Sequence, residues 1–186
     1  MSPTDRPRVA LVTGAGSGIG RCIVEGFALS QGAQVYALDK NAEAAAAVVR
    51  GINQAGGRAK TCVVDLADGP GLRQALPALL AEFGAPDIVV NNAGMAAMFP
   101  AAECPLEHWQ LTMAVNVTAP MLLMQHALPH MRERGWGRIV NVASISGLRA
   151  GTGRMAYGTS KAALIAMTRQ FAVEVAEWGE IGRAHV

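Results

Sequence analysis

The chain has 186 residues and a mass of 19.4 kDa, which fits one domain and leaves little room for a second. Hydrophobic residues make up 51% of the sequence and charged residues 16%, so the chain can build a core and its composition excludes intrinsic disorder. The net charge is +2 and no run of five like charges occurs, so nothing in the electrostatics supports a nucleic-acid or membrane partner.

Three cysteines, Cys22, Cys62 and Cys104, are odd in number and form no C-x-x-C pair. We predict that they are reduced, mostly buried side chains of a cytoplasmic protein. Residues 1–8 lack the apolar segment of a signal peptide, and we expect residues 1–7 to form a flexible tail. No His, Cys and Asp cluster has the spacing of a metal site, so we expect no metal.

Short apolar runs alternate with longer helical patterns along the chain. The predicted strands are Arg8–Thr13, Gln34–Leu38, Ala59–Val64, Asp87–Asn91 and Arg138–Ala143. The predicted helices are Gly18–Ser30, Asn41–Ala55, Gly71–Phe83, Pro105–Arg134 and Arg154–Trp178. This alternation is typical of βαβ units, so we predict an α/β fold with a Rossmann-like, doubly wound parallel sheet in a three-layer αβα arrangement. Ligands are expected beyond the carboxyl ends of the strands.

One stretch, Trp109–Met131, contains no Asp, Glu, Lys or Arg. A bilayer span would have to satisfy several polar groups in it, so we predict a buried amphipathic helix instead. The residues that argue against a span are Gln110, Asn116, Pro120, Gln125, His126, Pro129 and His130.

A glycine-rich turn follows the first predicted strand and leads directly into a helix. Its pattern is T-G-x-x-x-G-x-G, through Gly14, Gly18 and Gly20. Glycine lets the backbone approach a diphosphate, whose charge then lies on free N–H groups at the helix start. The strand, turn and helix context favours nucleotide binding over a turn without a ligand.

Acidic residues end the next two predicted strands. The carboxylate of Asp39 can accept hydrogen bonds from adenosine ribose hydroxyls and would repel a 2′-phosphate, which favours NAD over NADP. The neighbouring Lys40 offsets part of that repulsion, and the alternative is a solvated surface pair. Asp65 can bond the adenine edge, although an Asp at a strand end is often a turn or helix cap.

The fourth predicted strand ends in Asn91-Asn92-Ala93-Gly94. Small residues here let the loop lie against a flat cofactor, and the Asn side chains can tie neighbouring strands together. An ordinary Asn-containing turn explains the tetrapeptide nearly as well.

Tyr157 and Lys161 are four residues apart and share one face of a predicted helix. A free tyrosine has a pKa of about 10. An ammonium beside the phenol would favour phenolate and allow acid–base catalysis near neutrality, although a bare Y-x-x-x-K motif also arises by chance. Ser144, after the fifth strand, can hold a substrate oxygen beside Tyr157, and Ser146 is chemically equivalent.

Pro120 has no N–H, so in a helix the carbonyl of Asn116 is left without its partner and a kink is expected. A water held by that carbonyl could reach Lys161 and carry protons to solvent. The alternative is a proline kink with a simply hydrated carbonyl.

Taken together and in this order, these motifs resemble the short-chain dehydrogenase/reductase family from about residue 8 to about residue 179. The resemblance implies an NAD(P)-dependent oxidoreductase that interconverts a secondary alcohol and a ketone. The implied catalytic residues are Asn116, Ser144, Tyr157 and Lys161, and Ser144 is preferred to Ser146 because it lies 13 residues before Tyr157. The implied cofactor contacts are Gly14, Ser17, Gly18, Ile19, Gly20, Asp39, Asp65, Leu66, Asn92, Ala93, Gly94, Tyr157 and Lys161.

The same resemblance implies parts that the sequence does not contain. Relatives continue past the Tyr-Lys helix with further strands, a cofactor loop and a substrate lid. Residues 180–186 match none of these and look like a non-native tail. We therefore expect an incomplete Rossmann domain at residues 8–179 that is weakly active, inactive or poorly folded, whereas the full-length parent is an active dehydrogenase. The alternative is a natural short ending.

Two further expectations concern partners. The apolar faces of the two long C-terminal helices suggest a homodimer or homotetramer, as is common in relatives. Met95, Met98, Phe99, Leu148 and Met155 can line a hydrophobic site for a small alcohol or ketone, or belong to a core or interface. A catalytically silent NAD-binding sensor or interaction module is the competing function.

Overall fold

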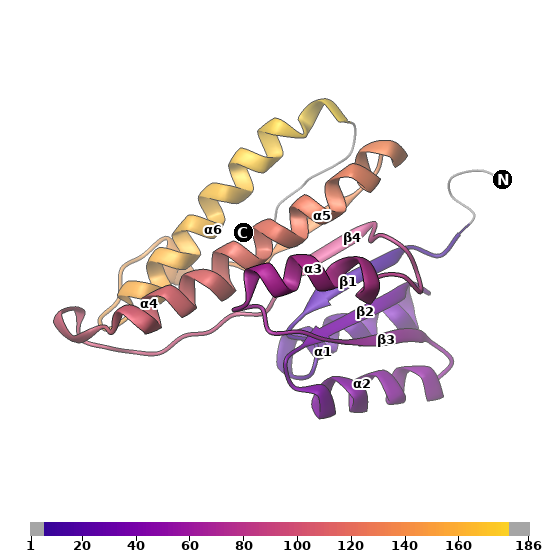
Figure 1. Ribbon diagram of the computed structural model, residues 1–186, viewed down its shortest axis with the longest axis horizontal. Helices are drawn as coiled ribbons and strands as arrows, with labels where there is room; N and C mark the ends of the chain where they lie inside the picture. The colour runs from indigo at the N-terminus through magenta and orange to yellow at the C-terminus, as the bar shows by residue number, and fades with distance from the viewer. Residues whose placement is uncertain (1–5, 179–186) are drawn as a thin grey trace.

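Five parallel strands form one sheet with the spatial order β3-β2-β1-β4-β5 (Figure 1). The computed structural model describes residues 6–178; residues 1–5, most of the tail expected to be flexible, and residues 179–186 lie outside that range. The strands are β1 (Val9–Thr13), β2 (Gln34–Asp39), β3 (Arg58–Val63), β4 (Ile88–Asn91) and β5 (Arg138–Asn141). Each overlaps a predicted strand, and the parallel, doubly wound sheet is confirmed.

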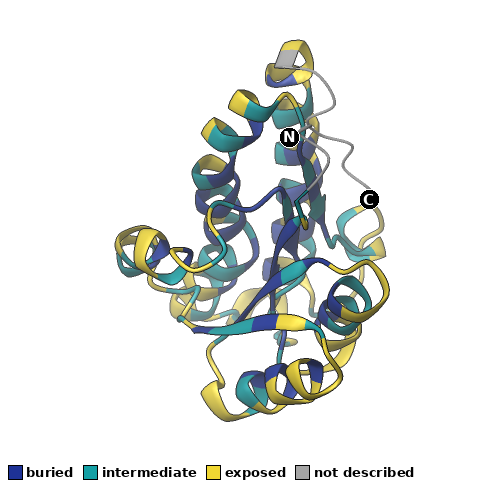
Figure 2. Ribbon diagram, turned by 90° about the vertical axis from the view of Figure 1, so that its right-hand side faces the viewer, coloured by how far each residue is buried: buried dark blue, intermediate teal, exposed yellow. Residues whose placement is uncertain are grey.

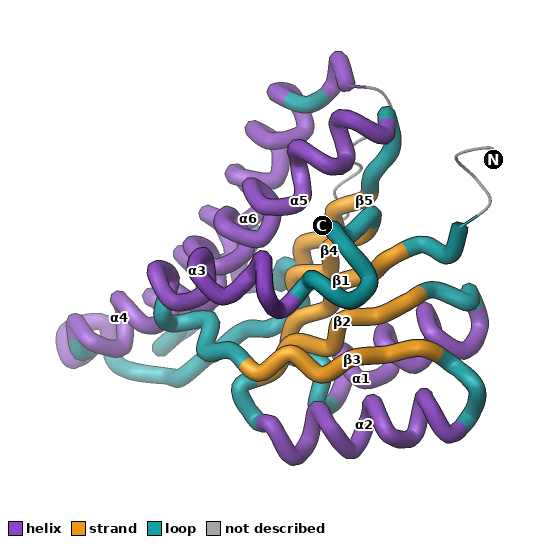
Figure 3. Tube along the Cα trace, turned by 45° about the vertical axis from the view of Figure 1, so that its right-hand side comes forward, coloured by secondary structure: helices purple, strands orange, loops and turns teal. Residues whose placement is uncertain are grey.

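Helices cover both faces of this sheet (Figure 3). They are α1 (Gly18–Glu25), α2 (Ala42–Gln54), α3 (Gly69–Leu79), α4 (Leu106–Met113), α5 (Ala119–Arg134) and α6 (Met155–Glu174). Side chains alternate along a strand, so Leu11 packs in the core shared with α3 and α5, whereas Val12 packs in the core shared with α1 and α2. Figure 2 shows the inner strands mostly in the dark blue of buried residues, whereas the edge strand β3 is partly exposed. The three-layer arrangement is therefore confirmed.

The predicted helix Pro105–Arg134 consists of three segments. A π-helical turn, Ala114–Thr118, joins α4 to α5, and in it the N–H of Ala119 donates to the carbonyl of Ala114. The widened turn directly precedes Pro120, which has no N–H for the next α-helical bond. The first predicted helix likewise ends in a π turn, Gly26–Ser30, and a short 3₁₀ turn, Ala176–Trp178, follows α6.

At the amino end of the sheet, the buried carboxylate of Asp87 joins several elements. It accepts hydrogen bonds from the Arg6 guanidinium at 2.8 Å and from the N–H of Val9 at 2.9 Å. His130 and Arg134, at the end of α5, lie 3.4 Å from the same carboxylate. Arg6, in the segment expected to be flexible, is thus attached to the start of β1 and β4.

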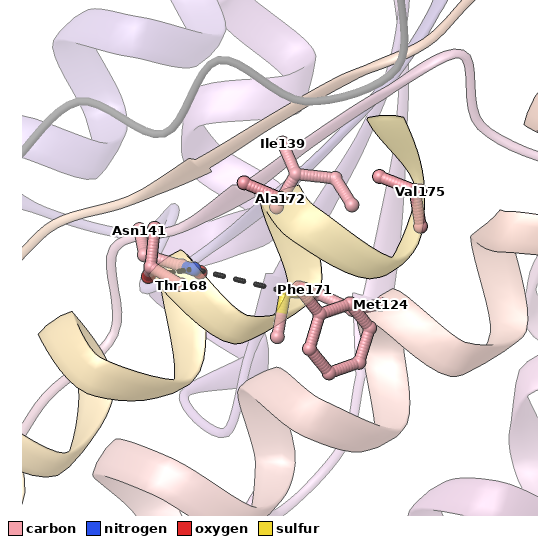
Figure 4. A pocket seen from close by; sticks show the side chains of 7 residues that line it. All are labelled: Met124, Ile139, Asn141, Thr168, Phe171, Ala172 and Val175. Carbon is pink, nitrogen blue, oxygen red and sulfur yellow. Dashed lines mark hydrogen bonds between the residues drawn. The ribbon is translucent and has the colours of Figure 1, made fainter. Parts of the chain in front are cut away.

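At the other end, polar side chains fix α6 to the sheet. The side chain of Asn91 donates to Asn141 at 2.7 Å, and Asn141 donates to Thr168 of α6 at 2.8 Å. Figure 4 shows Asn141 beside Thr168 and Met124, at a cavity of about 20 Å³ between β5, α5 and α6. The helix that carries Tyr157 and Lys161 is therefore held in place by hydrogen bonds as well as by packing.

Two predictions on buried segments have different outcomes. Within residues 6–178, no helix is long and apolar enough to cross a membrane, and Trp109–Met131 contributes buried residues to the core, as predicted. The prediction that the cysteines are mostly buried is wrong, because Cys22 is exposed and Cys104 is partly exposed. Cys62 is buried, and desolvation raises the pKa of its thiol to about 11.

Candidate active site

A cavity of about 360 Å³ opens at the carboxyl ends of β1, β2, β3 and β4. This is the edge where ligands bind in doubly wound sheets, and β1 and β4 flank the point at which the chain reverses its direction across the sheet. Six residues predicted to contact a cofactor line it: Gly14, Asp39, Asp65, Leu66, Ala93 and Gly94. The sequence analysis did not assign Val64, Leu111 and Val115, which also line it. The spacing of Leu111 and Val115, one helical turn apart, is the signal that could have identified their shared face.

The glycine turn after β1 has a backbone that other residues would not allow. Gly14 and Gly18 have φ angles of +67° and +53°. A Cβ atom on Gly20 would clash with the carbonyl oxygen of Gly14, and it would lie 2.7 Å from the side-chain nitrogen of Asn92. Gly20 is therefore required for the close packing of α1 against the loops, which leaves the helix start accessible to an anion.

The residues between these glycines are open to solvent. Ser17 precedes α1 without a side-chain capping bond, and Ile19 has 65% of its surface exposed. Neither Ser17, Gly18, Ile19 nor Gly20 lines the 360 Å³ cavity. Their role as cofactor contacts stays a prediction.

The carboxylate of Asp39 is held in a fixed position at the end of β2. One oxygen accepts from the N–H of Gly16 and the other from the N–H of Asn41, both at 2.9 Å. Each oxygen keeps a lone pair for a further donor such as a ribose hydroxyl. Asp65, at the end of β3, accepts from the N–H of Ala67 at 2.9 Å, so it acts as the turn cap considered for it while also lining the cavity.

The loop after β4 is bonded to β1, as the sequence predicted for its Asn side chains. Asn92 donates its side-chain N–H to the carbonyl of Thr13 at 2.9 Å. The hydroxyl of Thr13 accepts from the N–H groups of Asn92 and Ala93 at 3.0 and 2.9 Å. Thr13 is a positioning residue that the sequence analysis did not assign, although it begins the glycine motif.

Lys161 lies where the loops after β4 and β5 meet. Its Nζ donates to the carbonyl of Val142 at 2.7 Å and is 5.9 Å from the ring centre of Tyr157. A Cβ atom on Gly94 would be only 3.4 Å from that nitrogen. Burial lowers the pKa of Lys161. The half-buried phenol of Tyr157, the buried amine of Lys161 and the loop after β4 are thus brought together.

Two glycines bring the turn that follows β5 close to the start of α6. A Cβ on Gly158 would be 3.0 Å from the carbonyl oxygen of Ser146, and one on Gly147 would be 2.8 Å from the main-chain carbon of Lys161. Ser144 caps this turn by accepting from the N–H of Ser146 at 3.2 Å. Sequence reasoning missed both glycines, because only the fold shows what opposes them.

Asn116 is fully buried and acts through its side chain. Its Oδ1 accepts from the N–H of Met95 at 2.9 Å, and its Nδ2 donates to the carbonyl of Met95 at 3.0 Å and to Ser160 at 2.9 Å. The sequence analysis assigned a role only to the main-chain carbonyl, and the water proposed there stays a prediction. Within residues 6–178, no group of three His, Cys, Asp or Glu residues could hold a metal ion.

Comparisons with known proteins identify the family of this chain. The family model for short chain dehydrogenases matches residues 8–182. The chain belongs to the short-chain dehydrogenase family. This member is 39% identical over 175 residues to the D-threitol dehydrogenase of Mycolicibacterium smegmatis, with 94% of this chain and 66% of that protein covered. It is 40% identical over 176 residues to the 2-(R)-hydroxypropyl-CoM dehydrogenase of Xanthobacter autotrophicus, with 92% and 70% covered.

Solved structures give the same result for the fold of this short-chain dehydrogenase. A short-chain dehydrogenase from Streptomyces avermitilis matches with a TM-score of 0.88 and 32% identity, over 97% of this chain and 65% of that chain. A gluconate 5-dehydrogenase from Burkholderia cenocepacia, in complex with NADP and tartrate, matches with a TM-score of 0.87 and 32% identity, over 95% and 69%. The chain spans about two thirds of the length of these relatives.

Proposed function

We propose that this protein is an NAD-dependent dehydrogenase that interconverts a secondary alcohol and a ketone. The observation that carries the proposal is the position of Lys161, whose Nζ contacts the loop after β5 and lies against Gly94 of the cavity wall, one helical turn from Tyr157. The relatives named as dehydrogenases of D-threitol and of 2-(R)-hydroxypropyl-CoM support an alcohol as substrate.

The residues around the cavity fit a dinucleotide. The glycine turn leaves no space for a Cβ at Gly20, and it presents the start of α1 to a diphosphate. Asp39, which lines the cavity beside this turn, offers acceptors for ribose hydroxyls. The relative from Burkholderia cenocepacia was solved with NADP. We attribute the proposed preference of this chain for NAD to the negative charge of Asp39, which would repel a 2′-phosphate.

When bound, NAD supplies the hydride acceptor for oxidation of the alcohol. The side chains of this protein handle the proton and the substrate oxygen. We propose that Ser144 holds the oxygen, that Tyr157 takes the proton from the alcohol, and that the ammonium of Lys161 stabilises the phenolate and binds the nicotinamide ribose. Asn116 keeps the loop after β4 and helix α6 in register, so that these groups stay aligned.

Replacing Tyr157 by Phe tests the proposal. We expect the variant to bind NAD with unchanged affinity in calorimetry and to lose turnover by a factor of at least about 100, because the acid–base group is gone. Turnover is measured with a panel of secondary alcohols, for this chain and for a chimaera in which the last third of D-threitol dehydrogenase follows Glu174. Unchanged turnover in Tyr157→Phe, or no NAD binding by the parent chain, would overturn the proposal.

Tyr36 provides the matched control. Its hydroxyl donates to the carbonyl of Leu80 and accepts from the N–H of Phe83, both at 2.6 Å, in the core away from the cavity. The Tyr36→Phe variant should lose stability and keep its turnover per folded molecule. An NAD-binding sensor would behave differently, because Tyr157→Phe would then alter neither binding nor the sensing function.

We also propose that the protein self-associates through α5 and α6, and that it is located in the cytoplasm. The self-association is supported by apolar side chains that remain accessible on both helices: Val173 is exposed on α6, and Met121 and Leu128 are partly exposed on α5. Sedimentation velocity tests it directly, and a monomer at micromolar concentration would contradict it.

A further inference from the structure

In the segment that carries Ser144, Tyr157 and Lys161, every charged side chain is basic. Residues 134–173 contain five arginines and one lysine but no Asp or Glu. The opposing loop, residues 92–102, carries no charge at all. Two of these arginines, Arg149 and Arg154, lie exposed in the connection from β5 to α6. The connection from β5 to α6 therefore carries two positive charges and no carboxylate, and the dehydrogenase chemistry described above does not use these arginines.

Arg154 is the arginine nearest to Tyr157 along the chain. It is the N-cap residue of α6, and its carbonyl accepts the first helical bond from the N–H of Gly158. Tyr157 follows three residues later, in the first turn of α6. Arg154 and Tyr157 therefore both lie at the amino end of this helix.

The guanidinium group is bonded to the turn that Ser144 caps. Its Nη1 donates to the hydroxyl of Ser146 at 2.9 Å, and the N–H of Ser146 donates to the hydroxyl of Ser144. This bond uses one of the five N–H donors of Arg154. Within residues 6–178, no carboxylate lies within 4.0 Å of Arg154. Most of its hydrogen-bonding capacity and its whole charge are therefore available to a ligand.

Exposed apolar side chains occur in the segments next to Arg154. The N–H of Phe99 donates to the carbonyl of Gly153 at 3.1 Å, which joins the uncharged loop to the residue before Arg154. Met98 and Leu148 are exposed in the same two loops, and Met155 is exposed at the first position of α6. Exposed apolar side chains and a cation therefore occur together in these neighbouring segments, a combination that suits a small amphiphilic molecule.

We infer that Arg154 binds an anionic group of the substrate, so that the alcohol is a hydroxy acid whose carboxylate or comparable oxyanion lies a few bonds from the carbinol carbon. Guanidinium groups match carboxylates and other planar or tetrahedral oxyanions with paired N–H donors. The inference rests on the proposed function, because it concerns the same site. Beyond the proposed reaction, it names hydroxy acids as the substrate class and Arg154 as the residue that selects them.

The test compares matched anionic and neutral ligands. Binding of 3-hydroxybutyrate and of its methyl ester is followed by saturation-transfer NMR in the presence of NAD, and binding of 2-hydroxypropanesulfonate distinguishes sulfonate from carboxylate recognition. Turnover of the same compounds is measured in parallel as kcat/KM. Arg154→Gln removes the charge while keeping a polar side chain, and Arg169→Gln removes an exposed arginine elsewhere on α6 as the control.

The inference predicts that the parent chain prefers an anionic ligand to the ester by at least about 10-fold, and that Arg154→Gln abolishes the preference while Arg169→Gln retains it. The preference should also weaken as ionic strength rises. Equal binding of both anions and the ester, or a preference that survives in Arg154→Gln, would overturn it. If NMR shows the preference but no compound turns over, the proposed reaction fails and the anion site stands.

Discussion

The side-chain amide of Asn116 forms a two-point clamp on the main chain of Met95. Its oxygen accepts from the N–H of Met95 at 2.9 Å and its nitrogen donates to the carbonyl of Met95 at 3.0 Å. A third bond reaches Ser160 on α6 at 2.9 Å. One buried amide therefore joins the π turn, the loop after β4 and the helix that carries Tyr157 and Lys161.

Replacing Asn116 by Ala should destabilise the fold and misalign the site. The variant leaves buried donors and acceptors without partners, so we expect a loss of about 2–4 kcal/mol in the free energy of unfolding, measured in urea. Asn53 is the control, because its side chain makes the same pair of bonds with the main chain of Ala59 at an exposed position. Asn53→Ala should cost about 1 kcal/mol and should not change NAD-dependent turnover. Equal effects of both variants on turnover would contradict this assignment.

Lys161 should give the fold a specific pH dependence. Burial lowers the pKa of Lys161 in the folded state. At pH values between that lowered pKa and the unfolded-state pKa of about 10.4, the unfolded chain therefore binds more protons than the folded chain. Stability contributed by this group must then rise with pH. We expect the unfolding free energy of the parent chain, relative to Lys161→Met, to increase from pH 7 to pH 10 in urea titrations.

Lys60 is the control for that measurement. Its pKa is raised by a hydrogen bond with Glu82, so its contribution is present below about 10.4 and is lost only at higher pH. The difference between the parent chain and Lys60→Met should therefore be flat from pH 7 to pH 10. If the unfolding free energy relative to each variant rose equally with pH for both lysines, burial of Lys161 would not be the cause of the pH dependence.

The charge of Asp39 should decide between NAD and NADP. Asp39→Asn keeps an oxygen acceptor for the N–H of Gly16 but removes the negative charge, so we expect the ratio of NADP to NAD affinity to rise by about 10-fold. Isothermal titration with both dinucleotides measures the ratio. Asp68→Asn, at the cap of α3, removes a carboxylate with a comparable backbone bond and should leave the ratio as it was. No change in Asp39→Asn would mean that another group selects the cofactor.

Two glycine-to-alanine variants should have opposite effects on stability. A Cβ at Gly20 would clash with the Gly14 carbonyl, whereas a Cβ at Gly51, on the exposed face of α2, would have no neighbouring atom within 4 Å. We expect Gly20→Ala to lose NAD binding and at least about 2 kcal/mol of stability. Gly51→Ala should gain up to about 1 kcal/mol from its higher helix propensity. Thermal unfolding of both variants provides the comparison.

The sequence by itself determined the elements and the family, because these depend on local patterns. Apolar runs such as the one in β1 end at glycines or acidic residues, and the motifs around Gly14, Asn92 and Tyr157 lie at fixed positions relative to those runs. Their location at one edge of the sheet then follows from the parallel topology alone.

Only the tertiary structure decided which side chains meet across the chain. Asn116 contacts a residue 21 positions away, and Arg6 contacts one 81 positions away. The exposure of Cys22, the crowding at Gly147 and the hydrogen bond between Arg154 and Ser146 likewise depend on how loops pack. Such contacts are set by the summed packing of distant segments, and no local pattern of residues encodes which pairs that packing brings within hydrogen-bond distance.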